Sequence, residues 1–181
     1  MAMLTSDGVL PTLSELAAAA SVSRATVYRY FPTRSALIAA VMDQSLGPMR
    51  TYVSPQAAPQ ERIRDLLSRT VPRFSAYEVP MRAALQLSLE HWMLERSGKM
   101  KGEPYRRGFR VKILDRNLDA HRDQLAPDDY RRLHQALSVI YGIESFIVLR
   151  DLWQASDAQI AEMLQWMAEA FFAHAARDRV P

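Results

Sequence analysis

The chain has 181 residues, 49% of them hydrophobic, which is long and apolar enough to bury a core. The absence of cysteine excludes a disulfide scaffold and a thiolate zinc site, and it fits a reducing cytosol. A net charge of +3 does not by itself indicate a nucleic acid partner. With only 6 glycines and no alternating strand pattern, the sequence predicts an all-α protein. Because it has no signal peptide and no apolar run of about 18 residues, we expect a cytoplasmic protein that does not enter a membrane.

The first predicted elements are two short helices in TLSELAAAASVSRATVYRYF, which begins at Thr12. Thr12 and Glu15 have the spacing of a capping box, which marks a helix start. Residues 21–22 end the apolar stripe of this helix, and Ser23 is a suitable N-cap for a second helix that begins at Arg24. The stripe of the first helix contains Leu13, Leu16, Ala17 and Ala20.

The second of these helices divides its side chains between two faces. Val27, Tyr30 and Phe31 are expected on the inner side. The outer side carries Arg24, Ala25, Tyr28 and Arg29. No carboxylate occurs from residue 16 through residue 42, so the basic charge is local to this region. This pattern predicts a helix-turn-helix whose second helix enters the DNA major groove.

The run LAAAASVSRATVYRYFPTRSALI, residues 16–38, resembles the DNA-binding signature of the TetR family of bacterial repressors, including its V-S-x-x-T-x-Y-x-x-F core. The resemblance implies a ligand-responsive transcriptional regulator, most often a homodimeric repressor that a small molecule releases from a palindromic operator. Ser21 stands where the family usually has glycine, at a cost of about 1 kcal/mol if the backbone there is left-handed. Only seven residues precede Gly8, so the family's first helix is expected to be truncated.

Matching positions in the family suggest a role for each residue of the reading segment. Arg24 is the candidate for base readout, because a guanidinium can bind O6 and N7 of guanine. Ala25 can touch a thymine methyl, and Arg29 can read a base or hold a phosphate. Phosphate contacts, which set register rather than sequence preference, are expected from Thr26, Tyr28, Tyr30 and Arg34. Taken singly, each of these residues also fits an ordinary solvated helix.

After a stop at Pro32-Thr33, a helix is expected over residues 34–46 and should end at Gly47-Pro48. The proline-containing stretch that follows indicates a domain connection. We therefore divide the chain into a helix-turn-helix DNA-binding domain, residues 1–47, and a helical effector-binding and dimerisation domain, residues 48–181.

The second domain is expected to contain five helices, and its last two are apolar nearly all round. The resemblance implies that this last pair forms a four-helix bundle with its twin in a twofold homodimer. The final helix should begin after a capping box made by Ser156 and Gln159, and its predicted inner stripe is Ile160, Met163, Leu164, Met167, Ala170 and Phe171. The expected helices cover residues 60–77 with a break or kink at Pro72, 80–97, 104–124, 128–154 and 157–177.

Apolar side chains with a few polar groups among them make the second domain the expected place of an effector. Ordinary core packing is the alternative for the apolar members. Glu144, a carboxylate within an apolar run, is expected either to recognise a cationic or hydroxylated ligand, or else to pair with an arginine or cap a structural hydrogen bond. The candidate ligand-binding residues are Phe74, Tyr77, Met81, Trp92, Phe109, Tyr141, Glu144 and Ser145.

The sequence predicts no enzyme, cofactor or metal site. It contains no Gly-rich phosphate loop, no G-x-S-x-G elbow, no H-E-x-x-H and no cysteine nucleophile, and its four histidines lack i, i+4 pairing. Two other functions stay open. One is a dimeric ligand- or protein-binding module that lost DNA binding together with the first helix, and the other is a DNA-binding regulator with a filled core and no effector.

Overall fold

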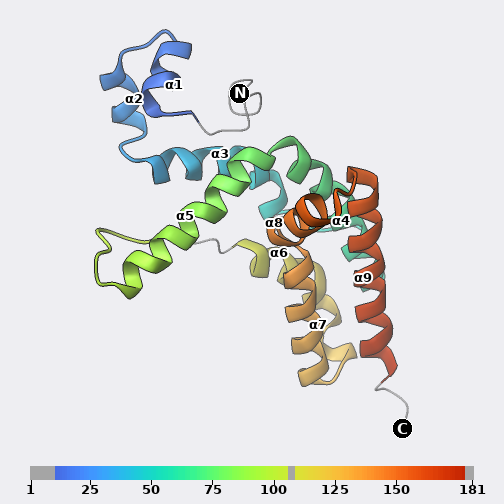
Figure 1. The fold of residues 1–181 in the computed structure, drawn as a ribbon. Helices are drawn as coiled ribbons and strands as arrows, with labels where there is room; N and C mark the ends of the chain where they lie inside the picture. Colours follow the sequence, from blue (N-terminus) through green and yellow to red (C-terminus); the bar gives the residue numbers. More distant parts are fainter. Residues whose placement is uncertain (1–10, 106–108, 178–181) are drawn as a thin grey trace. The chain divides into compact units, whose positions relative to one another are not determined.

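The computed structural model describes residues 11–105 and 109–177, and every regular element within these ranges is a helix (Figure 1). This confirms the predicted all-α fold. The described residues form two compact units. The first combines residues 11–47 with 76–105, and the second combines 48–75 with 109–177. The functional boundary proposed after residue 47 stays a prediction. None of the described helices is long and apolar enough to cross a membrane.

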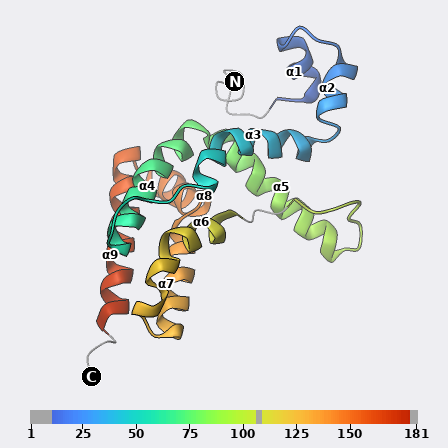
Figure 2. The ribbon, with the colours of Figure 1, turned by 180° about the vertical axis from the view of Figure 1, so that it is seen from behind.

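The first unit contains α1 (Leu13–Ala19), α2 (Arg24–Tyr30), most of α3 (Arg34–Arg50) and α5 (Glu78–Arg96). Figure 2 shows α1 and α2 as neighbouring short helices followed by the longer α3. One face of α3 supports α1 and α2, because Leu37 and Val41 pack against Leu13, Leu16 and Phe31. Another face of α3 packs on α5 through Ile38, Met42, Ala83, Ala84 and Leu87.

Two proline predictions in this part of the sequence were wrong. Gly47-Pro48 does not end α3, which continues to Arg50. Pro48 lies in the last turn, where a proline removes only one backbone hydrogen bond. The helix α4 (Pro59–Ala76) is likewise continuous through Pro72, so the predicted break is absent, whereas the kink stays a prediction. The following helix, α5, begins at Glu78 and holds Pro80 in its first turn, where no intrahelical donor is required.

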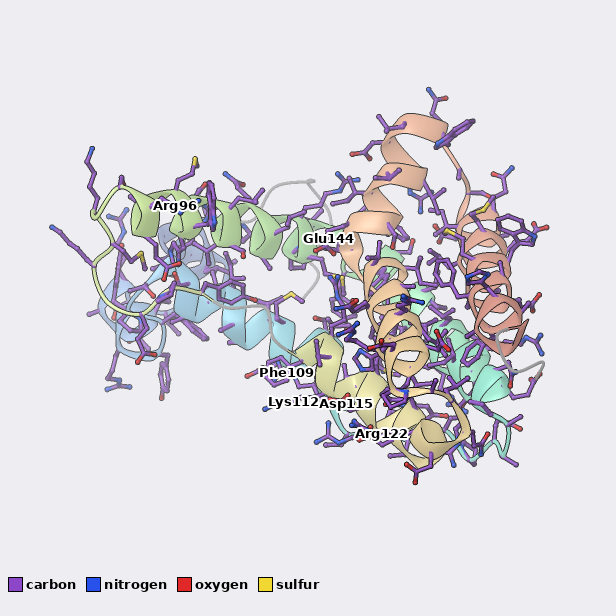
Figure 3. The ribbon with its side chains drawn as sticks, turned by 90° about the horizontal axis from the view of Figure 1, so that it is seen from below. Arg96, Phe109, Lys112, Asp115, Arg122 and Glu144 are labelled. Carbon is purple, nitrogen blue, oxygen red and sulfur yellow. The ribbon has the colours of Figure 1, made fainter. Side chains whose placement is uncertain are left out.

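The second unit consists of α4, α6 (Phe109–Leu118), the 3-10 helix η2 (Asp119–Gln124), α7 (Pro127–Ile140), α8 (Ile143–Ile147), the π-helical turn η3 (Val148–Leu152) and α9 (Asp157–Arg177). Its α7 packs against α6 and α9. Figure 3 shows Phe109, Lys112 and Asp115 following one another along α6. The helix predicted over residues 104–124 was wrong at both ends, because residues 104–105 are not helical and the α-helix changes to a 3-10 helix at Asp119.

The final helix begins as predicted, with the capping box of Ser156 and Gln159. Its inner stripe differs from the prediction. Met163 and Ala170 are exposed, and Met167 and Phe171 are only half-buried. The α9 residues that are buried in the unit are Ile160, Leu164, Ala168, Phe172 and Ala175. The sequence did not separate the two faces because both are apolar.

The long helix predicted over residues 128–154 was also wrong, because the chain leaves the helical conformation at Tyr141-Gly142. In a continuous helix the N–H of Gly142 would donate to the carbonyl of Ser138. Here Nη1 of Arg110 donates to that carbonyl at 2.8 Å. The Oγ of Ser145 donates to the carbonyl of Ile140 at 2.7 Å, so side chains satisfy the backbone acceptors that the break frees.

The space beside Gly142 is filled by two side chains, whereas its backbone angles place no special demand on the residue. Its φ of −175° is ordinary extended backbone. A Cβ at this position would lie 2.1 Å from Nη2 of Arg110 and 2.6 Å from Oε2 of Glu144. Nη2 of Arg110 in turn donates to that Glu144 oxygen at 2.5 Å. The guanidinium therefore occupies the volume beside Gly142 and holds the junction between α7 and α8.

A buried amide fastens the segment between α3 and α4 to α6. Asn117 is fully buried, and its Oδ1 accepts from the N–H of Ser54 at 2.8 Å. Its Nδ2 donates to the carbonyls of Tyr52 at 3.1 Å and Ile113 at 2.8 Å. The hydrogen bonds to Tyr52 and Ser54 fix the connection, and the one to Ile113 orients the amide on α6.

Candidate nucleic-acid interface

The first helix of the motif begins at a complete capping box. Oε2 of Glu15 accepts from the N–H of Thr12 at 2.7 Å, and Oγ1 of Thr12 accepts from the N–H of Glu15 at 3.2 Å. The hydrogen bonds that Oε2 of Glu15 accepts from the N–H and from the hydroxyl of Thr12 lower the pKa of the Glu15 carboxyl. The prediction of a helix start at this point is confirmed.

The turn between the two helices carries a strained serine. Ser21 has a φ of +54°, in the left-handed region where glycine is favoured. The turn closes by hydrogen bonds from the N–H of Val22 to the carbonyl of Ala17 at 3.0 Å and from the N–H of Ser21 to that of Ala18 at 3.1 Å. The left-handed backbone that the sequence suggested for Ser21 is therefore present.

The second helix starts at Ser23, whose Oγ accepts from the N–H of Thr26 at 3.1 Å. This confirms the predicted N-cap. The hydroxyls of Ser23 and Thr26 also lie 2.9 Å apart, so the Thr26 hydroxyl is part of the cap. Val27 is the buried residue of this helix and anchors it.

Most of the predicted DNA-contacting side chains lie together on the exposed surface of α2. Arg24, Ala25 and Arg29 are exposed, and Arg34 is exposed at the start of α3. Tyr28 is 50% exposed. Because the sequence from residue 16 through residue 42 contains no carboxylate, these arginines meet no acidic neighbour within their own segment.

The prediction that Tyr30 lies on the inner side of α2 was wrong. Its side chain is 66% exposed, and Phe31 fills the core beside Leu37 and Val41 instead. Tyr30 is the last residue of α2, and the backbone leaves the helix at Phe31 with φ −128° and ψ 80°. Helical periodicity therefore no longer applies at the point where the two aromatic side chains diverge.

Residues 2–41 match the family model described as bacterial regulatory proteins, tetR family. The match, which covers the N-terminal part of the chain, supports membership of the TetR family. This identifies the chain as a DNA-binding transcriptional regulator, with the helix-turn-helix of α1 and α2 as its DNA-binding motif. No curated protein and no solved structure matches the chain. The match does not extend beyond α3, and the predicted truncation of the family's first helix concerns residues outside those that the structure describes.

The structure distributes the predicted effector-binding residues over both units. Tyr77, Met81 and Trp92 belong to the first unit, and the others belong to the second. Phe74 and Tyr141 are brought together, with ring centroids 6.4 Å apart, and Phe146 lies 6.1 Å from Phe74. Burial raises the pKa of Tyr141 to about 12. These three aromatic side chains form a buried cluster of the second unit.

The Tyr141 hydroxyl reaches across this cluster to Oγ1 of Thr70, at 3.0 Å. The sequence analysis did not identify Thr70, because the only feature that marks it is a polar side chain in an apolar helix. It also missed Arg110, which pairs with Glu144, since a basic residue at the start of a helix usually faces solvent. Of the two interpretations of Glu144, the structure shows the pairing with an arginine.

The remaining candidates are spread more widely. Phe109 is 45% exposed, with the guanidinium of Arg50 lying 3.6 Å from its ring centroid. Trp92 is 56% exposed, and Arg96 lies 5.3 Å from its ring. Met81 is buried, and Tyr77 is half-buried. The Ser145 hydroxyl donates hydrogen bonds to backbone carbonyls at the break between α7 and α8.

Proposed function

We propose that the chain is a ligand-responsive repressor that binds a palindromic operator as a homodimer and leaves it when a small molecule binds. The observation that carries the proposal is the construction of α2. This helix is capped by Ser23 and anchored by Val27, and it presents exposed arginines and tyrosines from a segment without acidic residues. A short, rigidly supported helix of this kind fits the major groove.

Within this proposal, Arg24 reads a base, because it is the first residue of α2 and the N-terminal residues of a recognition helix contact base edges. Ala25 beside it meets a thymine methyl. Arg34 is the first residue of α3, where helix N-termini favour phosphate. Thr26 and Tyr28 offer hydroxyls to the DNA backbone.

Dimerisation is proposed through the outer surface of η3 and α9. The inner residues of α9 are buried in their own unit, yet large apolar side chains remain exposed on the other side. Large exposed apolar side chains are typical of an interaction surface, and a twofold axis lets one surface pair with itself. The residues are Val148, Leu152, Trp153, Met163 and Trp166, which are between 41% and 75% exposed.

The effector is proposed to bind in the second unit, beside the candidates Phe74, Phe109, Tyr141, Glu144 and Ser145. A cationic effector would compete with Arg110 for Glu144. Release from DNA requires that the effector bind the non-binding conformation more tightly than the DNA-bound one. An effector that binds without changing DNA affinity would refute this coupling.

The DNA-binding part is tested by Arg24→Ala against Arg131→Ala, which removes the same charge from an exposed position on α7. Arg24→Ala should weaken binding to a preferred duplex by about 1–3 kcal/mol and relax the preference at one base pair. Arg131→Ala should leave that preference unchanged. Equal behaviour of the two variants, measured by fluorescence anisotropy, would remove Arg24 from base readout.

The dimer is tested by Trp166→Glu, with Val111→Glu as the control, since Val111 is also an exposed apolar residue but lies on α6. Light scattering should show a monomer for Trp166→Glu and a dimer for the control. A dimer in both cases would contradict the proposed interface.

A further inference from the structure

An arginine and a tyrosine at the end of α2 form a stacked pair. The Cζ atom of Arg29 lies 5.2 Å from the centroid of the Tyr30 ring. A guanidinium within about 6 Å of an aromatic centroid is attracted by the negative face of the ring. Both side chains are exposed, so the pair sits on the outer surface of α2.

The position of the Tyr30 ring is not explained by core packing. Phe31 rather than Tyr30 packs beside Leu37 and Val41. Nor does an ion pair hold Arg29, since the structure gives it no hydrogen bond or salt bridge among the described residues and its segment contains no carboxylate. The contact with the ring is thus the interaction that restrains the Arg29 side chain.

We propose that Tyr30 is a positioning residue for DNA recognition, whose ring, rather than its hydroxyl, holds Arg29 in the conformation that contacts the operator. The proposal rests on the DNA-binding function of α2. A free arginine side chain loses much rotamer freedom when it binds. Stacking on an aromatic face already restricts the side chain before binding, so less freedom is lost in the binding step. An exposed stack of this kind changes affinity by about two- to fivefold.

Tyr28 provides a matched comparison on the same helix. It is 50% exposed, and no arginine is stacked on its ring among the described residues. A tyrosine that acts through a hydroxyl–phosphate contact loses that contact when phenylalanine replaces it. A tyrosine that acts through its ring does not. Phenylalanine and leucine substitutions therefore separate the two roles.

The experiment measures binding of the full chain to its preferred duplex for Tyr30→Phe, Tyr30→Leu, Arg29→Met and the double variant Arg29→Met/Tyr30→Leu, with Tyr28→Phe as the comparison. Tyr30→Phe keeps the ring and should therefore bind more tightly than Tyr30→Leu. Tyr30→Leu should bind about two- to fivefold more weakly, with the same change in base preference and salt dependence as Arg29→Met. In the Arg29→Met background the leucine should have no further effect.

Equal losses for Tyr30→Phe and Tyr30→Leu, or a full leucine effect without Arg29, would overturn the proposal.

A second measurement needs no DNA. The NMR signal of the Arg29 Hε should be shifted by the ring current in the unaltered chain and in Tyr30→Phe, and should lose that shift in Tyr30→Leu. Thermal melting checks that each variant is folded. No binding by the unaltered chain would overturn the DNA-binding function, whereas an unshifted Hε would overturn the pairing alone.

Discussion

Replacement of Gly142 by alanine tests the account of the break between α7 and α8. The added methyl would lie 2.1 Å from Nη2 and 2.4 Å from Cζ of Arg110. Ordinary carbon contacts are about 3.5–4.0 Å, so the guanidinium must move away. It then loses its hydrogen bonds to the Ser138 carbonyl and to Glu144.

We expect Gly142→Ala to lower the free energy of unfolding by about 1–2 kcal/mol. Hydrogen bonds to charged groups contribute about 1.5–3 kcal/mol, but Arg110 and Glu144 are each about a third exposed, which reduces the value. Alanine also restricts the unfolded chain, which offsets about 0.4–1 kcal/mol. The measurement is the urea unfolding midpoint.

Two controls make this result decisive. Gly47→Ala adds the same methyl within α3, where nothing lies within 4 Å of the new atom, and should stabilise the chain by about 0.5–1 kcal/mol. In an Arg110→Ala background, Gly142→Ala should no longer destabilise. If its cost were the same with and without Arg110, the guanidinium would not be the reason for the glycine.

Three further changes follow from other contacts. Asn117→Leu should lower the free energy of unfolding by about 2–4 kcal/mol in urea titrations, because buried backbone groups lose their partners. Hydrogen bonds from Ser75 and Arg150 lower the pKa of Asp157 below its ordinary 3.8. The stabilisation that the Asp157 carboxylate provides is therefore present above about pH 4 and is lost as the pH falls below that value. Asp157→Asn should reduce the difference in unfolding midpoint between pH 7 and pH 3. Ser21→Gly should raise the free energy of unfolding by up to about 1 kcal/mol and the melting temperature with it, because it relieves the left-handed backbone.

The parts of the fold that follow from short-range rules could be predicted from the sequence. The caps at Thr12, Ser23 and Ser156 depend on residues within one helical turn, and all three are present. The left-handed turn at Ser21 belongs to the same class. The helix-turn-helix was predictable because it is assembled from these local signals.

The failures have long-range causes. The break at Gly142 depends on Arg110, which is remote in sequence, and nothing in the apolar run itself announces it. The outward position of Tyr30 depends on where the backbone leaves α2, and element ends are the least regular part of a helix. The partner of Glu144 could not be chosen without the packing of α6 against its neighbours. For this reason the capped helices α1 and α2 were easier to predict than the packing around Glu144.

The measurement that bears most directly on the regulator is a selection from random DNA duplexes with the purified chain at about 100 mM salt, followed by a salt titration on the enriched duplex. We predict a palindrome bound by a dimer. Release of counterions by Arg24, Arg29 and Arg34 of both protomers should give a log–log slope as steep as about −5. Failure to enrich any sequence, or an affinity that does not change with salt, would contradict operator binding by α2.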